Sequence, residues 1–291
     1  MVKHRYLRVR QTRRVSRSAA GNATVIIFLL LFGTFMVLPL YYMVVSALKP
    51  TSELFYFPPK FYVIKPTLQN FVQLIKLQSQ SDVPFERYLF NSVFVTVVST
   101  VGYVIVASMA AYALSKHKFP LKGTISQGVV FAILFRPEVT SVPLYIIMVK
   151  LGMVDNYWSL ILPAMSSSFG VFLLQQFLDN VPNEMIEAAR LDGASEFTIY
   201  RKLIMPMLKP AWMTVVIFTF ISIWNTTATQ FIYSESMKML PSMLSSLSTA
   251  GISRTGVAAA VGVLMMFPSV VIFLLSESSI VETMAHSGLK G

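Results

Sequence analysis

Charged side chains inside an apolar stretch could do chemistry, because charges in a bilayer need a partner or water. Arg136 and Glu138 flank Pro137 in a run that is otherwise apolar. A charge at the centre of a bilayer costs about 3 kcal/mol. We expect a helix broken at the proline, and broken helices often line transport sites. Two interpretations stay open: Arg136 binds or steers an anionic substrate group, or it pairs with Glu138 or reaches water at the interface.

A second set of side chains could contact a sugar, because aromatic rings stack on sugar rings and amides bond hydroxyl groups. The candidates near span ends are Tyr145, Tyr157, Trp158, Trp224 and Asn225. Tyr and Trp near span ends are also typical interfacial anchors, and this alternative stays open. The candidate substrate path comprises Arg136, Glu138, Tyr145, Trp224 and Asn225.

Other chemistries lack the residues that they need. The chain has no cysteine, and its histidines, His4, His117 and His286, are too scattered to indicate a metal site. We find no Ser/His or Asp pair within the apolar runs and no H-E-x-x-H. There is also no G-x-x-x-x-G-K-[ST] loop, so this chain is not expected to bind ATP. We therefore predict no catalytic residue, no metal and no cofactor bound by this chain.

The polar stretch Glu187-Ala188-Ala189-Arg190-Leu191-Asp192-Gly193-Ala194 lies between two apolar runs. Pro182 suits a first helical turn, and Gly193 can take the left-handed conformation that ends a helix. Helical spacing places Met185, Ala188, Ala189 and Asp192 on one nearly flat face. A second short helix is expected with Ser195 as its N-cap and an apolar side made of Phe197, Tyr200, Leu203 and Ile204. Pro206 and Pro210 should then interrupt the chain.

The elements that position these residues are membrane spans. The chain has 291 residues, of which 55% are hydrophobic and 13% charged, a composition typical of membrane proteins. About twenty apolar residues are needed to cross a bilayer. On that rule we predict six spans, near residues 23–48, 91–114, 128–149, 157–177, 211–231 and 257–275. Small residues in the second and sixth spans favour close helix packing.

Basic residues predict the orientation. Seven of them, with no acid, lie in the first 17 positions: Lys3, Arg5, Arg8, Arg10, Arg13, Arg14 and Arg17. Lys and Arg also gather in the 115–124 loop and the 182–206 segment, so both termini and these loops are expected in the cytoplasm. We interpret residues 1–22 as a basic cytoplasmic tail that could touch anionic lipid rather than nucleic acid, and residues 23–291 as one transmembrane domain.

The 49–88 connection carries Pro58, Pro59, Pro66 and Pro84 and many aromatic residues. It is interpreted as an ordered cap on the outer side. It could dock an external binding protein, or it could simply cover the helix bundle.

The stretch EAARLDGA, followed by SEFTIYRK and then LIMP, resembles the coupling loop of ABC-importer permeases. The one visible departure is Met205, where that family often has Leu. The resemblance implies an all-α integral membrane protein with six spans and the type I importer permease (MetI-like) fold. It also implies that this loop, residues 182–206, docks on an ATPase subunit. The implied docking residues are Glu187, Ala188, Ala189, Asp192, Gly193 and Ala194.

Further stretches, such as LPLYYMVVSALKP at 38–50 and AAYALSKHKFP at 110–120, are similar to permeases of the carbohydrate-uptake class. The ending VETMAHSGLKG is similar to a subgroup that handles oligosaccharides such as alginate or pectin fragments. The resemblance implies a bacterial inner-membrane location. It also implies a second homologous permease, an extracytoplasmic solute-binding protein and two ATP-binding subunits that carry ATP and Mg. The alternative is a stand-alone secondary transporter, which would need carboxylates within its spans, and only Glu138 qualifies.

Overall fold

The computed structural model describes residues 19–79, 83–249, 251 and 254–288, and every regular element in these ranges is helical. Four helices are long: α1 (Ala19–Leu48), α4 (Phe85–Lys116), α12 (Lys209–Trp224) and α14 (Thr255–Gly288). Shorter helices are α2 (Thr51–Leu54), α3 (Gln69–Ser79), α5 (Lys122–Ile133), α6 (Pro137–Lys150), α7 (Trp158–Met165), α8 (Ser168–Asp179) and α13 (Leu240–Thr249). The predicted tail and the chain's last residues lie mostly outside the described ranges.

Six membrane crossings are available in the described chain. Four apolar helical stretches are long enough to span: Gly21–Leu48, Phe85–Lys116, Trp158–Asp179 and Thr255–Glu277. Two bent pairs, α5 with α6 and Glu196–Met207 with α12, supply up to two more. This agrees with the all-helical fold class predicted from the sequence.

Two predicted spans need correction. The span predicted at 128–149 is not one helix, because α5 and α6 meet at an angle of 112°. Arg136 is extended there, since the residue before a proline avoids helical geometry. The span predicted at 211–231 is also too long, because α12 ends at Trp224. The apolar residues after it are buried in a turn, so their hydrophobicity signals burial and not a helix.

Helix α4 is the centre of the bundle and packs against α7, α8 and α12. Its small residues Ala107, Ser108 and Ala111 are fully buried, which confirms the predicted close packing. Gly170 of α8 comes so near that a Cβ there would lie 2.5 Å from the Tyr103 hydroxyl oxygen. Helix α14 lies beside α12 and α1 and buries Ala260 in the same way.

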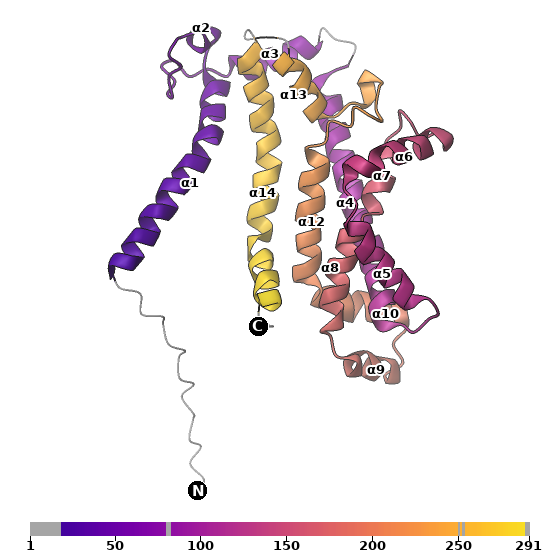
Figure 1. The fold of residues 1–291 in the computed structure, drawn as a ribbon. Helices are drawn as coiled ribbons and strands as arrows, with labels where there is room; N and C mark the ends of the chain where they lie inside the picture. Colours follow the sequence, from indigo (N-terminus) through magenta and orange to yellow (C-terminus); the bar gives the residue numbers. More distant parts are fainter. Residues whose placement is uncertain (1–18, 80–82, 250, 252–253, 289–291) are drawn as a thin grey trace.

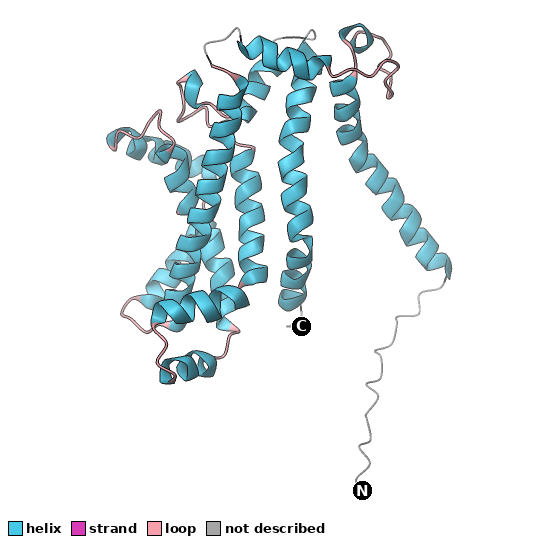
Figure 2. Cartoon of the chain, turned by 180° about the vertical axis from the view of Figure 1, so that it is seen from behind, coloured by secondary structure: helices cyan, strands magenta, loops and turns pink. Residues whose placement is uncertain are grey.

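Helix α1 differs from the rest because it leans away from the bundle (Figures 1 and 2). No residue of its most apolar 18-residue window is buried within this chain. Only its last turns pack, where Met43 and Ala47 contact α14. The exposed length is suited to lipid or to another membrane subunit.

The bundle has two distinct ends (Figure 1). At one end lie α9 (Asn183–Leu191) and α10 (Glu196–Ile199), together with the start of α1 and the end of α14. At the other end lie α2, α3 and α13. We call these the α9 end and the α3 end. Of the segments predicted to share a side from their basic residues, the 115–124 loop and the 182–206 segment share the α9 end, whereas the seven basic residues of the tail lie outside the described residues.

Candidate partner-docking surface and substrate path

Helix α9 stands at the tip of the α9 end and is anchored by one apolar side chain. Ile186 is 3% exposed and packs into the largest core cluster, which joins α4, α8 and α12. Pro182 is extended and precedes the helix, whereas we predicted it in the first turn. Glu184 lies in the first turn and Arg190 in the last, so both charges favour the helix dipole.

Gly193 ends α9 as predicted. Its φ is +80°, a conformation that costs other residues energy. The Ala194 N–H donates to the Ala189 carbonyl oxygen at 3.0 Å, and the Gly193 N–H donates to that of Arg190, also at 3.0 Å. This is the Schellman arrangement, which satisfies the last carbonyl groups of a helix. A Cβ at Gly193 would meet no atom within 4 Å, so the requirement for glycine is conformational.

The second short helix starts at the predicted cap, where the Ser195 hydroxyl oxygen accepts a bond from the Thr198 N–H. It continues as a π-helix over Tyr200–Ile204 and as α11 (Met205–Met207), and the chain then bends by 78° into α12. The predicted apolar side is wrong at Phe197, which is 67% exposed. The wider π turn aligns residues five apart, so Ile199 is buried in its place, together with Ile204, which was predicted correctly.

A shallow groove of about 420 Å³ separates the two short helices. It is lined by Met185, Ala188, Ala189, Asp192, Ala194, Thr198, Ile199, Lys202 and Leu203. The four residues predicted to share one face of α9 therefore do so. Their small side chains let another backbone approach closely, which suits a protein partner.

Glu187 faces a different, polar cavity of about 530 Å³. Its walls are Lys116, the last residue of α4, and His117 and Lys118, which follow that helix, together with Asn183, Ile186, Glu187, Arg190 and Glu196. The structure thus places five of the six predicted docking residues in two hollows on opposite sides of α9, Glu187 in one and four in the other, whereas Gly193 lines neither. Sequence reasoning used Lys116 and Lys118 only for orientation and treated His117 as isolated.

Glu196 is the hub of that cavity. Arg190 Nε donates to Glu196 Oε1 at 2.7 Å, and this bond raises the pKa of the guanidinium. The Tyr112 hydroxyl donates to Glu196 Oε2 at 2.9 Å, and His117 Nε2 lies 3.4 Å from the same oxygen. At the start of α9, Lys116 Nζ donates to the Val181 carbonyl oxygen at 2.6 Å. Both ends of α9 are therefore tied to the end of α4.

The predicted substrate-path residues do not converge. Arg136 and Glu138 are exposed at the bend and form no ion pair with each other, so an internal pair is excluded. The structure corrects the prediction for Trp224. Its side chain is 2% exposed, and its indole N–H donates to the Met265 carbonyl oxygen at 2.8 Å. It holds α12 to α14 and faces no path within this chain. Asn225 is exposed and bonds the Ile221 carbonyl oxygen.

Tyr145 and Tyr157 pack against the segment 226–239, which connects α12 with α13. The Tyr145 ring stacks on Phe231 with centroids 6.3 Å apart. The Tyr157 hydroxyl donates to Asn91 Oδ1 at 2.7 Å, whereas Trp158 remains half exposed. Sequence reasoning missed this segment, because its two charged residues, Glu235 and Lys238, match no site motif and its apolar residues follow no helical or strand period.

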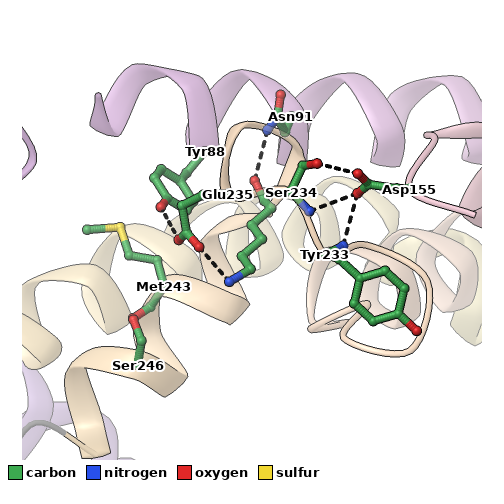
Figure 3. Close-up of polar contacts among 9 residues, drawn as sticks. Tyr88, Asn91, Asp155, Tyr233, Ser234, Glu235, Met243 and Ser246 are labelled. Atoms are coloured by element: carbon green, nitrogen blue, oxygen red, sulfur yellow. Dashed lines mark hydrogen bonds and ion pairs between the residues drawn. The ribbon is translucent and has the colours of Figure 1, made fainter. Parts of the chain in front are cut away.

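Asp155 secures the segment 226–239 (Figure 3). Its carboxylate accepts bonds from the Ser234 hydroxyl, the Ser234 N–H at 2.8 Å and the Tyr233 N–H at 3.0 Å. The pKa of Asp155 is lowered, chiefly by the Ser234 hydroxyl and then by the Ser234 N–H. Asn91 Nδ2 donates to the Ser236 and Lys238 carbonyl oxygens, and the Tyr88 hydroxyl donates to Glu235 at 2.5 Å.

Comparisons with known proteins agree with this architecture. A family model described as "Binding-protein-dependent transport system inner membrane component" matches residues 23–280. The probable ABC transporter permease protein YurM of Bacillus subtilis (strain 168) is 31% identical over 279 residues, which cover 93% of this chain and 89% of that protein. The polygalacturonan/rhamnogalacturonan transport system permease protein YtcP of the same organism is 30% identical over 206 residues, covering 71% and 70%.

A solved structure has a similar fold. It is a crystal structure of a bacterial ABC transporter involved in the import of the acidic polysaccharide alginate. One of its chains superposes with a TM-score of 0.78 at 21% identity, over 91% of this chain and 99% of that one. Together with the family match, the apolar helices and the loop between α8 and α12, this establishes the class of the protein. The chain belongs to the binding-protein-dependent transport system inner membrane components and is a multi-pass ABC-importer permease.

Proposed function

We propose that this permease forms part of the path of an ATP-driven oligosaccharide importer. The observation that carries the proposal is the family match over residues 23–280 in a chain whose coupling-type loop forms a groove at the tip of the α9 end. Relatives named for polygalacturonan/rhamnogalacturonan and for arabinooligosaccharide transport support a carbohydrate substrate. A second homologous permease would complete the path.

The α9 end is proposed to face the cytoplasm and to receive an ATP-binding subunit. Its groove, with Ala188, Ala189 and Asp192 along one wall, would take a segment of that subunit. Glu187 and Arg190 would offer charged contacts on the other side of α9. ATP and Mg would be bound by two such partner subunits, because this sequence has no phosphate-binding loop. ATP-driven closure of the partners would then move α9 and, through the Lys116 bond and the buried Ile186, the end of α4.

We propose further that the substrate is an acidic oligosaccharide delivered by an extracytoplasmic binding protein. Arg136 supports this, since its guanidinium is exposed at the bend between α5 and α6 and has no carboxylate partner among the residues that the structure describes. A guanidinium binds a uronate carboxylate in bidentate geometry. A stand-alone secondary transporter is disfavoured, because the family depends on a binding protein.

The test is ATPase activity of the purified importer in liposomes, with binding proteins loaded with uronate or neutral oligosaccharides. We expect stimulation by the uronate-loaded protein, and we expect Arg136→Gln to reduce it. Arg254→Gln is the matched control, because Arg254 is equally exposed but lies at the α3 end away from the bend. Stimulation only by neutral sugar would discard the acidic substrate, and the absence of a co-purifying ATPase would discard the importer.

A further inference from the structure

The segment between α2 and α3 displays an unusual number of large apolar side chains at the α3 end. It lies at the end of α1 and projects away from α12 and α4 (Figure 1). Phe57 is 96% exposed, and half or more of each of several neighbours is exposed too: Phe55, Phe61, Tyr62 and Ile64. Contiguous apolar surface of this kind indicates a partner or a membrane.

Buried charged groups fix this segment in place. Glu53 is 7% exposed and accepts bonds from the Ile64 N–H at 3.0 Å and the Lys65 N–H at 2.9 Å. Lys49 is 2% exposed and donates to the Lys60 carbonyl oxygen. Burying a charged group is costly unless it is hydrogen-bonded, so these contacts fix the backbone of the segment. The exposed rings are therefore held outward and are not the tip of a loose loop.

A groove of about 360 Å³ joins this segment to α1. Leu38, Pro39 and Tyr42 of α1 form one side, and Pro59 and Phe61 form the other. The Tyr42 and Phe61 rings lie 5.5 Å apart. The groove continues the exposed apolar surface of α1, and its apolar lining suits an aliphatic chain rather than a sugar.

The segment and the helix after it carry only positive charge. Residues 54–81 contain three lysines and no acidic residue. Lys60 lies in the chain between the two groove residues Pro59 and Phe61, with Nζ over the Tyr56 ring at 5.1 Å from its centroid. Lys65 is exposed nearby. Aromatic and basic residues together are typical of the headgroup level of a membrane.

We propose that the groove between α1 and residues 55–65 binds an anionic phospholipid from the leaflet at the α3 end. An acyl chain lies against Leu38, Pro39 and Phe61, and the phosphate pairs with Lys60 and Lys65. The exposed rings enter the interface around the bound lipid and hold the outer end of α1 at a fixed depth. The inference rests on the membrane location of the chain and not on its substrate, so either can fail alone.

The test uses a fluorescent label on Phe57→Cys in the assembled importer, with cysteine-free partner subunits, since this chain has no cysteine of its own. Phe57 is almost fully exposed, so the substitution leaves the core intact. Ser248→Cys on α13 is the control, because Ser248 is exposed at the same end outside the groove. The importer is placed in vesicles that carry brominated acyl chains either on phosphatidylglycerol or on phosphatidylcholine.

We expect brominated phosphatidylglycerol to quench the label at position 57 more strongly than an equal amount of brominated phosphatidylcholine. The double variant Lys60→Gln, Lys65→Gln should remove this preference but keep quenching by lipid. The label at position 248 should respond to aqueous iodide instead. Equal quenching by the two lipids in the unaltered lysine background would overturn the site. Iodide quenching at position 57, or shielding only when the solute-binding protein is added, would show that water or that protein covers the segment.

Discussion

The two ends of the bundle hold their functional segments in different ways. At the α9 end, the docking surface is built from consecutive residues. One glycine turns the chain, one serine caps the next helix, and alanines leave the face flat. At the α3 end, the segment 226–239 is held by side chains that are distant in sequence, such as Asn91 and Asp155.

The difference teaches what each end has to do. A docking surface must keep its shape while it moves against a partner. Local hydrogen bonds maintain that shape, whereas Ile186 and Lys116 join it to α4. The segment 226–239 is fixed only while α4 and the 151–157 turn stay in place, because its bonds reach to both. A rearrangement of the helices would therefore leave α9 intact and release that segment.

The largest effect is expected from Gly193→Asp. A residue with a side chain resists a φ of +80°, at a cost of about 1 kcal/mol, and the new carboxylate lies beside Asp192 on the docking face. We expect the importer to assemble but transport to fall at least tenfold while ATP hydrolysis loses its dependence on binding protein. Transport assays and ATPase assays on the same preparation measure both.

Gly152→Asp provides the control for the α3 end. Gly152 has a φ of +66° and, like Gly193, no atom within 4 Å of an added Cβ. The conformational cost is therefore the same, but the site is far from α9. Coupled transport should persist in this variant at equal expression. If both variants were uncoupled, a general loss of stability would explain the effect, and the proposed docking role of Gly193 would be rejected.

The same contrast explains which features could be predicted from the sequence. The cap at Ser195, the turn at Gly193 and the shared face of α9 depend on neighbours within a few residues, so local rules predicted them. The burial of Trp224 and the role of Asp155 depend on partners found only in three dimensions. Phe197 failed for a related reason, because no sequence signal announced the π turn that follows it.

A smaller effect is expected from Asp155→Asn, which weakens the anchor of segment 226–239. The amide keeps one acceptor oxygen but loses the charge that strengthens three bonds, so the loss is about 1 kcal/mol at this exposed position. A spin label on Thr229→Cys, an exposed position of the segment, should become more mobile. A label on α9, at Leu191→Cys, should be unaffected. Equal mobility changes at both positions would end the contrast between the two ends.

Acid should reproduce that loosening without a substitution. Because the folded-state pKa of Asp155 is lowered, the carboxylate stabilises the segment above the ordinary Asp value of about 3.9. This stabilisation is lost as the pH falls through the lower, folded-state value. The mobility of the label at position 229 should therefore be constant from pH 7 to about pH 4 and rise below it. In the Asp155→Asn background the acid-dependent rise should shrink to the part due to Glu235, whose pKa is also lowered and which bonds Lys238 and Tyr88.

The smallest effect is expected from Glu196→Gln, although Glu196 is the most connected side chain at the α9 end. Its pair with Arg190 is exposed, and such pairs contribute less than about 1 kcal/mol. The Ser195 cap and the burial of Ile199 and Ile204 remain, so α9 and α10 should keep their arrangement. We expect transport to fall less than about twofold at low salt and the deficit to vanish at high salt, where exposed pairs are screened. A large, salt-independent loss would instead mean that Glu196 transmits motion from α9 to α4, and that the α9 end is not locally self-sufficient.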